Sequence, residues 1–70
     1  MSIAQRLKEC RHDADMTQES LAFASGVSVA HVTKIETGSR TPSDEIVRKL
    51  AGALEVDASE LRPDIDTDAH

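Results

Sequence analysis

The side chains best suited to chemistry lie between Thr17 and Lys34, and the chemistry they offer is noncovalent recognition. Thr17 and Ser28 each precede a helical pattern, where a hydroxyl can accept a hydrogen bond from a free backbone N–H. The N-terminus of a helix also presents N–H groups and a partial positive charge, which together suit a phosphate. After Ser28, the side chains of Val29 and Ala30 are short, apolar and unable to donate hydrogen bonds, and Lys34 is the one cation of that helix.

Catalytic and metal chemistry find no support in the spacing of the reactive residues. Cys10 is the single cysteine, and His12, His31 and His70 are scattered along the chain. The sequence has no nucleophile–base arrangement with support and no phosphate-binding glycine loop. We therefore expect no enzyme activity, no catalytic residues, no metal and no cofactor.

The charge of the chain is divided unequally along its length. The 70 residues carry a formal net charge of −5. Residues 1–49 hold seven basic and seven acidic side chains and are therefore neutral overall. Residues 50–70 hold one basic residue, Arg62, and six carboxylates, which account for the whole excess of negative charge. The excess negative charge thus lies away from the half that contains Thr17 and Ser28.

Length and hydropathy set further limits. Seventy residues allow one small domain, near the size at which a single core is only marginally sufficient. The chain has one Phe and no Trp or Tyr, so its core must be aliphatic and thin. No signal peptide or long apolar run is present, which predicts a soluble cytoplasmic protein with no membrane partner.

The spacing of apolar residues predicts five helices and no strands. We expect these helices to begin at about Ser2, Thr17, Ser28, Ser43 and Asp57. The residues expected to face inward are Ile3, Leu7, Cys10 and Ala14 in the first helix, and Ile46, Val47, Leu50 and Leu54 in the fourth. The turn Ser25-Gly26-Val27 joins the second and third helices too tightly for anything except a steep crossing. That arrangement is a helix-turn-helix, which presents its second helix to a DNA major groove.

Three of the helix starts share a local regularity. An apolar pair flanks each cap with the spacing of a hydrophobic staple: Met16 with Leu21, Val27 with Val32, and Val56 with Leu61. Asp57 and Glu60 have the spacing of a capping box for the last helix, and Pro63 prevents its continuation. Gly26 and Gly38 supply the positive φ that helix C-termini favour.

With these residues in place, the chain resembles the lambda-repressor/Cro-like (XRE-type) helix-turn-helix family from about Ile3 to Leu61. The elements that carry the resemblance are Leu7, Arg11, Thr17-Gln18, Leu21-Ala22, Gly26-Val27-Ser28, Val32, Ile35-Glu36, Gly38, Pro42, Leu50-Ala51, Leu54 and Val56. The resemblance implies an all-α, compact five-helix DNA-binding domain over residues 1–62. Residues 63–70 would then be an acidic, disordered tail.

The resemblance also implies which residues meet double-stranded DNA. Base-edge contacts are expected from Val29, Ala30 and Lys34, with His31 and Thr33 at the margin; phosphate contacts are expected from Thr17, Gln18, Ser28, Thr37, Ser39 and Arg40. It further implies a structural, partly buried ion pair between Arg11 and Glu36, although Glu36 could instead be a solvated acid. Relatives often carry cations where this chain has Ala24, Val29, Thr37 and Ser39, so phosphate contacts should be few.

The function expected from this pattern is that of a transcriptional regulator of phage or bacterial type. It would act as a homodimeric repressor on a palindromic operator, with an A·T-leaning readout. The candidates for the dimer contact are Leu54, Val56, Leu61 and Ile65, although these could simply close the core. The alternative is a protein-interaction module, of antitoxin or anti-repressor type, that binds a partner through Phe23, Val29 and the acidic C-terminal end. A third possibility is a module that needs a separate oligomerisation subunit.

Two side chains and one short segment can each be interpreted in two ways. Phe23 is expected to pack against His31, the alternative being exposure to a partner. Cys10 is expected to be a buried small hydrophobe, the alternative being a redox switch. The run from Asp64 to Asp68 resembles the start of a calcium loop, but Ala69 stands where glycine is needed, so a solvated tail is expected instead.

Overall fold

The computed structural model describes residues 2–64 as five helices joined by short loops, and these residues contain no strand. The helices are α1 (Ile3–Asp13), α2 (Gln18–Ser25), α3 (Val29–Glu36), α4 (Asp44–Leu54) and α5 (Ala58–Leu61). The predicted all-α class and the number of helices are thereby confirmed. The expectations for Ile65 and the rest of the acidic tail lie outside the described residues.

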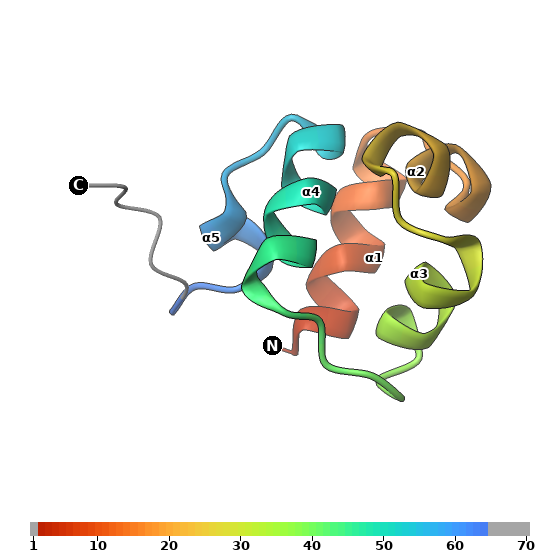
Figure 1. Ribbon diagram of the computed structural model, residues 1–70. Coiled ribbons are helices and arrows are strands. Elements are labelled where there is room, and N and C mark those ends of the chain that lie inside the picture. The colour runs from red at the N-terminus through yellow and green to blue at the C-terminus, as the bar shows by residue number, and fades with distance from the viewer. Residues whose placement is uncertain (1, 65–70) are drawn as a thin grey trace.

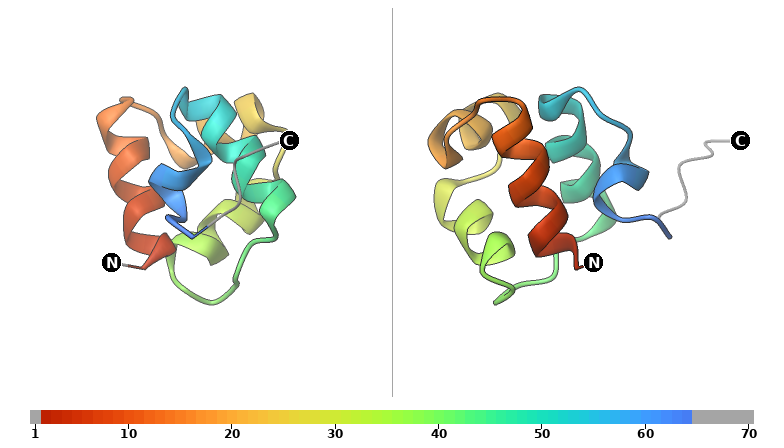
Figure 2. Two further views of the ribbon diagram at one scale, coloured as in Figure 1. Left: turned by 90° about the vertical axis from the view of Figure 1, so that its left-hand side faces the viewer. Right: turned by 180° about the vertical axis from the view of Figure 1, so that it is seen from behind.

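Each of the five helices packs mainly against two others. α3 and α5 both pack on α1, whereas α2 packs on α3 and on α4 (Figure 1). α4 in turn contacts α5, which lies on the side of the molecule away from α3 (Figure 2). α3, the helix that follows the tight turn, therefore packs on α1 and α2 with one side and lies at the edge of the molecule with the other.

Side-chain caps fix the starts of the four longer helices. Ser2, Thr17, Ser28 and Ser43 each have extended backbone and accept a hydrogen bond from the amide three residues on. The predicted capping box at α5 is wrong, because the side chain of Asp57 makes no cap hydrogen bond. The backbone carbonyl of Asp57 accepts instead from the Glu60 amide at 2.8 Å, which is enough to close a single turn.

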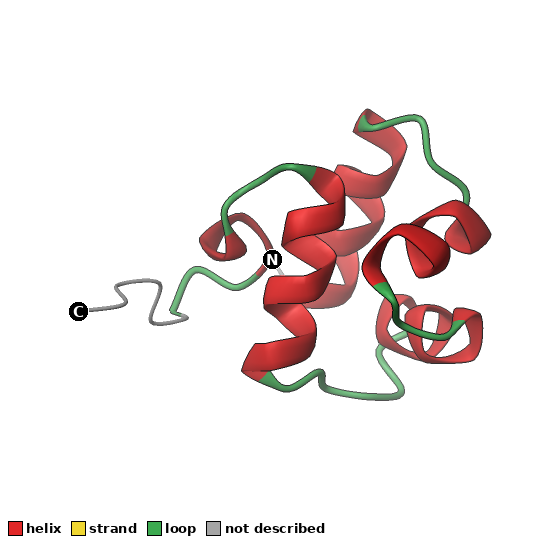
Figure 3. Cartoon of the chain, turned by 45° about the horizontal axis from the view of Figure 1, so that its top comes forward, coloured by secondary structure: helices red, strands yellow, loops and turns green. Residues whose placement is uncertain are grey.

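The tight turn between α2 and α3 depends on one glycine. Gly26 has φ 77°, and both its amide and that of Val27 donate to the Ala22 carbonyl, which ends α2. Figure 3 shows the helices in red and the short loops between them in green. The positive φ predicted for Gly26 and Gly38 is confirmed, the latter with φ 82°. α4 ends in the same left-handed conformation without a glycine, at Glu55 with φ 59°.

The core is aliphatic, as predicted. Its fully buried members come from every helix: Leu7, Leu21, Val32, Ile35, Val47, Leu50 and Leu61. Met16 and Val56, the outer members of two predicted staples, are half-buried against this cluster. Ala14 was expected to face inward but is exposed, because α1 ends at Asp13 and Ala14 is its C-cap.

Two of the residues proposed for a dimer contact belong to this core. Leu54 is 6% exposed and Leu61 is 0% exposed, so both are covered within the single chain. The alternative reading, in which they close the core, is therefore the right one for these two. Arg62 fastens the segment after α5: it donates to the Pro42 carbonyl at 3.1 Å and pairs with Asp44 at the start of α4.

Candidate nucleic-acid interface

The third helix is buried on one side and uncovered on the other. Val32 and Ile35 are 0% exposed and hold α3 against the core. Val29 is 41% exposed, and Ala30 and Lys34 are exposed as well. The three residues expected to make base-edge contacts thus share an open surface, which consists of short apolar side chains followed by one cation.

The N-terminus of α3 is also at the surface. Ser28 is exposed, and its hydroxyl accepts from the His31 amide at 3.1 Å. That bond satisfies one of the first amides of the helix, and the helix N-terminus retains its partial positive charge. Thr17 performs the same task for α2, where it accepts from the Ser20 amide at 2.9 Å and also donates to the Ser20 hydroxyl.

Arg11 and Glu36 form the ion pair that the resemblance implied. The Arg11 Nε donates to Glu36 Oε2 at 2.6 Å and its Nη2 to Oε1 at 3.1 Å, a two-point contact between α1 and α3. The Arg11 Nη1 also donates to the Met16 carbonyl at 2.9 Å. The Glu36 side chain is 2% exposed, so the carboxylate is withdrawn from water.

The ionisation of Glu36 follows from these contacts. Burial by itself pushes the pKa of this carboxyl upward. The hydrogen bonds from Arg11 and Gln18, together with the positive charges of Arg11 and Lys8, outweigh burial and hold the pKa below its usual value. Glu36 is therefore an ionised, hydrogen-bonded group at neutral pH.

Gln18 joins this pair to the third helix. Its Nε2 donates to Glu36 Oε1 at 3.0 Å, and its Oε1 accepts from the Thr33 hydroxyl at 2.9 Å. Gln18 was expected to lie at the phosphate-facing end of α2, but much of its amide is engaged inside the molecule, and Gln18 and Thr33 are both half-buried. No signal in the sequence indicated these two bonds, because the partners are 18 and 15 positions apart and spacing says nothing of their rotamers.

The loop after α3 offers further polar groups. Thr37, Ser39 and Arg40 are all exposed. The Thr37 hydroxyl lies 3.1 Å from the Lys34 carbonyl and 3.0 Å from the Ser39 hydroxyl, which ties the loop to the end of α3. The cations Lys34 and Arg40 thus lie at this end of the helix.

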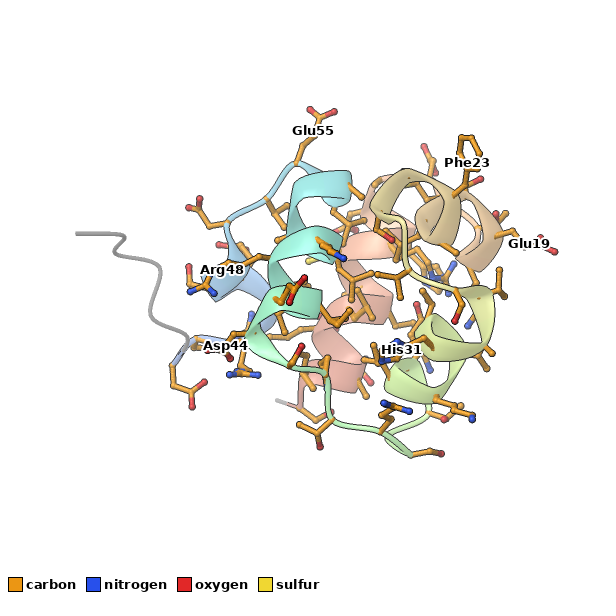
Figure 4. The ribbon with its side chains drawn as sticks, viewed as in Figure 1. Glu19, Phe23, His31, Asp44, Arg48 and Glu55 are labelled. Atoms are coloured by element: carbon orange, nitrogen blue, oxygen red, sulfur yellow. The ribbon has the colours of Figure 1, made fainter. Side chains whose placement is uncertain are left out.

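The predicted contact between Phe23 and His31 is wrong. Phe23 is 92% exposed and projects from the outer side of α2, while His31 lies on α3 toward the loop that leads into α4 (Figure 4). His31 is half-buried, and its Nε2 is buried with no hydrogen-bond partner among the described residues. The marginal base contact expected of His31 stays a prediction.

Cys10 lies between α1 and the core, as a small apolar residue would. It is half-buried against the hydrophobic cluster. Burial, followed by the neighbouring Glu60 carboxylate, raises the pKa of the Cys10 thiol, which disfavours the reactive thiolate. Among residues 2–64 no group of three or more His, Cys, Asp or Glu side chains could hold a metal ion. No helix in that range is both long and apolar enough to cross a membrane.

A tight turn between two crossed helices, with the second braced from behind and open in front, defines the helix-turn-helix class of DNA-binding domains. The helix-turn-helix family model matches residues 7–61. The chain therefore belongs to this family, the lambda-repressor-like regulators that bind double-stranded DNA, which are not enzymes.

Individual relatives agree with the family. The chain is 39% identical over 59 residues to the uncharacterized HTH-type transcriptional regulator YazB of Bacillus subtilis, covering 84% of this chain and 86% of YazB. It is 36% identical over 61 residues to the cryptic phage CTXphi transcriptional repressor RstR of Vibrio cholerae, covering 87% of this chain and 54% of RstR. The chain thus spans about half the length of RstR.

A solved structure has the same fold. The crystal structure of the restriction-modification controller protein C.AhdI from Aeromonas hydrophila superimposes with a TM-score of 0.82 at 41% sequence identity. The match covers 84% of this chain and 89% of C.AhdI. At that identity and coverage, both the five-helix architecture and the family assignment rest on nearly the whole described chain.

Proposed function

We propose that this protein is a sequence-specific repressor of transcription that inserts α3 into the major groove of a palindromic operator. It acts as a homodimer in the cytoplasm of a bacterium, or from a phage genome within one. Two-fold symmetry places the two copies of α3 about 34 Å apart, in successive major grooves on one face of the duplex. The likeness to a phage repressor and to a controller protein supports a regulatory role of this kind.

The observation that carries the proposal is the two-sided burial of α3. Val32 and Ile35 anchor its inner side with no exposed surface, so the helix is held rigidly. On the opposite side Val29, Ala30 and Lys34 are all exposed, Val29 to 41%. A rigid helix with a free, narrow apolar face and a terminal cation has the shape and chemistry of a groove reader.

The direct test is selection of binding sites from random duplex DNA at low salt, followed by footprinting of any enriched palindrome. We expect an A·T-leaning site, because Val29 and Ala30 can contact thymine methyl groups but cannot donate to guanine. Affinity should fall steeply with added salt, in proportion to the few phosphates that each protomer neutralises. Absence of enrichment would overturn the proposal.

Lys34→Ala tests the face itself. The variant should bind the selected operator about 5- to 100-fold more weakly and change the base preference at one position, as expected for loss of a side chain that reaches a base edge. Phe23→Ala is the matched control, since Phe23 lies on α2 outside this surface. Equal effects of the two substitutions on operator binding would contradict the assignment of α3 as the reading helix.

A second function is favoured by one observation, the exposure of Phe23. An aromatic side chain that is 92% exposed on a helix surface is suited to a protein partner. In that case the chain is a protein-interaction module of antitoxin or anti-repressor type, with its acidic C-terminal end contributing to the contact. Phe23→Ala would then abolish partner binding, Lys34→Ala would not, and no operator would be enriched at any salt concentration.

A further inference from the structure

The hydrogen bonds that connect Arg11, Glu36, Gln18 and Thr33 converge on the Glu36 carboxylate. Arg11 donates to it from one side, and on the other side Thr33 donates to Gln18, which donates to Glu36. A guanidinium can only donate, and an ionised carboxylate can only accept. Glu36, paired with Arg11, therefore forces Gln18 to turn its Nε2 toward the carboxylate, at 3.0 Å from Oε1. The opposite orientation of the amide would place two oxygen atoms against each other.

This constraint passes from Gln18 to Thr33. With the amide so oriented, Gln18 Oε1 faces the Thr33 hydroxyl at 2.9 Å and can only accept from it. A threonine hydroxyl has one hydrogen, and that hydrogen is given to Gln18. The Thr33 oxygen is left with lone pairs alone, while Gln18 Nε2 retains one N–H beyond the bond to Glu36.

Thr33 and Gln18, the last two members of this chain of bonds, both lie beside the exposed surface of α3. Thr33 follows Val29 by four residues, so the two side chains stand one above the other along the same side of the helix. Gln18 is the first residue of α2, the end of that helix whose N–H groups suit a phosphate. A free hydroxyl could donate or accept; this hydroxyl can only accept.

We propose that the bonds from Arg11 through Glu36 and Gln18 fix Thr33 as an acceptor-only contact that selects an amino base at one operator position. This inference rests on the proposed function. In the major groove adenine and cytosine present an amino group, whereas guanine and thymine present only acceptors beside the thymine methyl. The position that Thr33 contacts therefore carries adenine or cytosine in preference to guanine or thymine.

The experiment compares binding sites selected from random duplex DNA by the wild type, Thr33→Val, Thr33→Ser and Gln18→Ala. Circular dichroism and thermal melting first establish that each variant is folded. The wild type should prefer adenine or cytosine about two- to tenfold at one position, the range of a single net hydrogen bond. Thr33→Ser should keep the preference for adenine or cytosine. Thr33→Val should lose it at that operator position and leave the other positions unchanged. Gln18→Ala removes the acceptor of the Thr33 hydroxyl hydrogen, so that this hydroxyl can also donate. The variant should therefore accept guanine and thymine at the same operator position.

Glu36→Gln should weaken the base preference at the same position. A neutral amide can donate as well as accept, so it no longer fixes the orientation of the Gln18 amide. Lys34→Ala is the matched control and should alter a different position. If the wild type selects an operator that Lys34→Ala changes, but Thr33→Val leaves every preference intact, the inference is wrong and the proposed function stands. A Thr33-dependent position that prefers guanine or thymine overturns it as well. If the wild type selects no sequence, the proposed function is wrong, and the inference that rests on it is wrong with it.

Discussion

At the scale of single residues, the buried carboxylate of Glu36 is the most consequential group in the molecule. Its oxygens accept two hydrogen bonds from Arg11 and one from Gln18, so it connects α1, α2 and α3 at one point. Removing one partner of such a pair leaves an uncompensated charge, at a cost of about 3–5 kcal/mol when the site is fully buried. Arg11 is 11% exposed, which places the cost near the lower end of that range.

This pair makes stability depend on pH. The pKa of Glu36 is lower in the folded protein than in the unfolded chain, so its stabilisation is fully present above the unfolded value and is lost as pH falls. The free energy of unfolding of the wild type should therefore exceed that of Glu36→Gln at pH 7. The difference should shrink as pH is lowered below about 4.3. Denaturant titrations of both proteins from about pH 7 down to about pH 2.5 measure it, and a pH-independent difference would contradict the linkage.

Some of these residues could be predicted from the sequence and others could not. Arg11 and Glu36 were predictable because the resemblance places them on facing helices. The bonds of Gln18 depend on rotamers and on the placement of α2 against α3, which no spacing specifies. The exposure of Phe23 did have a signal: it lies four residues after Glu19 on α2, and so on the polar side of that helix.

At the scale of the helices, local signals predicted the starts and ends well because capping is local chemistry. The hydroxyl caps and the glycine turn formed as expected. The failure at Asp57 has a clear cause: α5 has only four residues, and a backbone hydrogen bond from Glu60 already closes its single turn. The spacing of Asp57 and Glu60 could not reveal that the Asp57 side chain would make no cap hydrogen bond.

Two glycines offer a matched test of the helix framework. Gly26 has φ 77°, and no atom lies within 4 Å of the place where a methyl group would be added, so Gly26→Ala should destabilise the fold by about 1 kcal/mol through backbone strain alone. Gly52 lies inside α4, is exposed and has the same free space. Gly52→Ala should therefore stabilise by about 0.5–1 kcal/mol. Urea denaturation measures both changes; shifts of the same sign would be inconsistent with the turn described above.

At the scale of the whole molecule, the small aliphatic core sets a narrow margin of stability. A domain of this size is stable by roughly 4–10 kcal/mol. Sequence composition predicted a thin core, and the core residues were mostly predictable from helical spacing. The proposed dimer contact was misassigned at Leu54 and Leu61, because spacing cannot distinguish a residue that closes the core from one that is free to meet a second protomer.

Truncation of a central leucine should therefore bring the domain close to unfolding. Leu50 is 1% exposed, and Leu50→Ala should cost about 2–5 kcal/mol, which lowers the melting temperature by roughly 10 °C or more. Phe23→Ala removes a larger side chain from a site that is 92% exposed and should change stability by no more than about 0.5 kcal/mol. Thermal melts followed by circular dichroism compare the two; similar shifts would show that the burial described for these residues is wrong.

The position of α5 on the side away from α3 gives the molecule an electrical polarity. The surplus carboxylates follow Leu50 in the sequence, with Arg62 as the one cation among them. Glu55, Asp57 and Glu60 belong to α5 and the loop before it, whereas Lys34 belongs to α3 and Arg40 to the loop after it. α5 and α3 lie on opposite sides of the molecule (Figure 1). Near any polyanion such a charge distribution experiences a torque that swings the α5 end outward and brings α3 forward. A protein with a net charge of −5 can thus approach a duplex in the productive orientation more often than chance, and added salt should weaken this alignment.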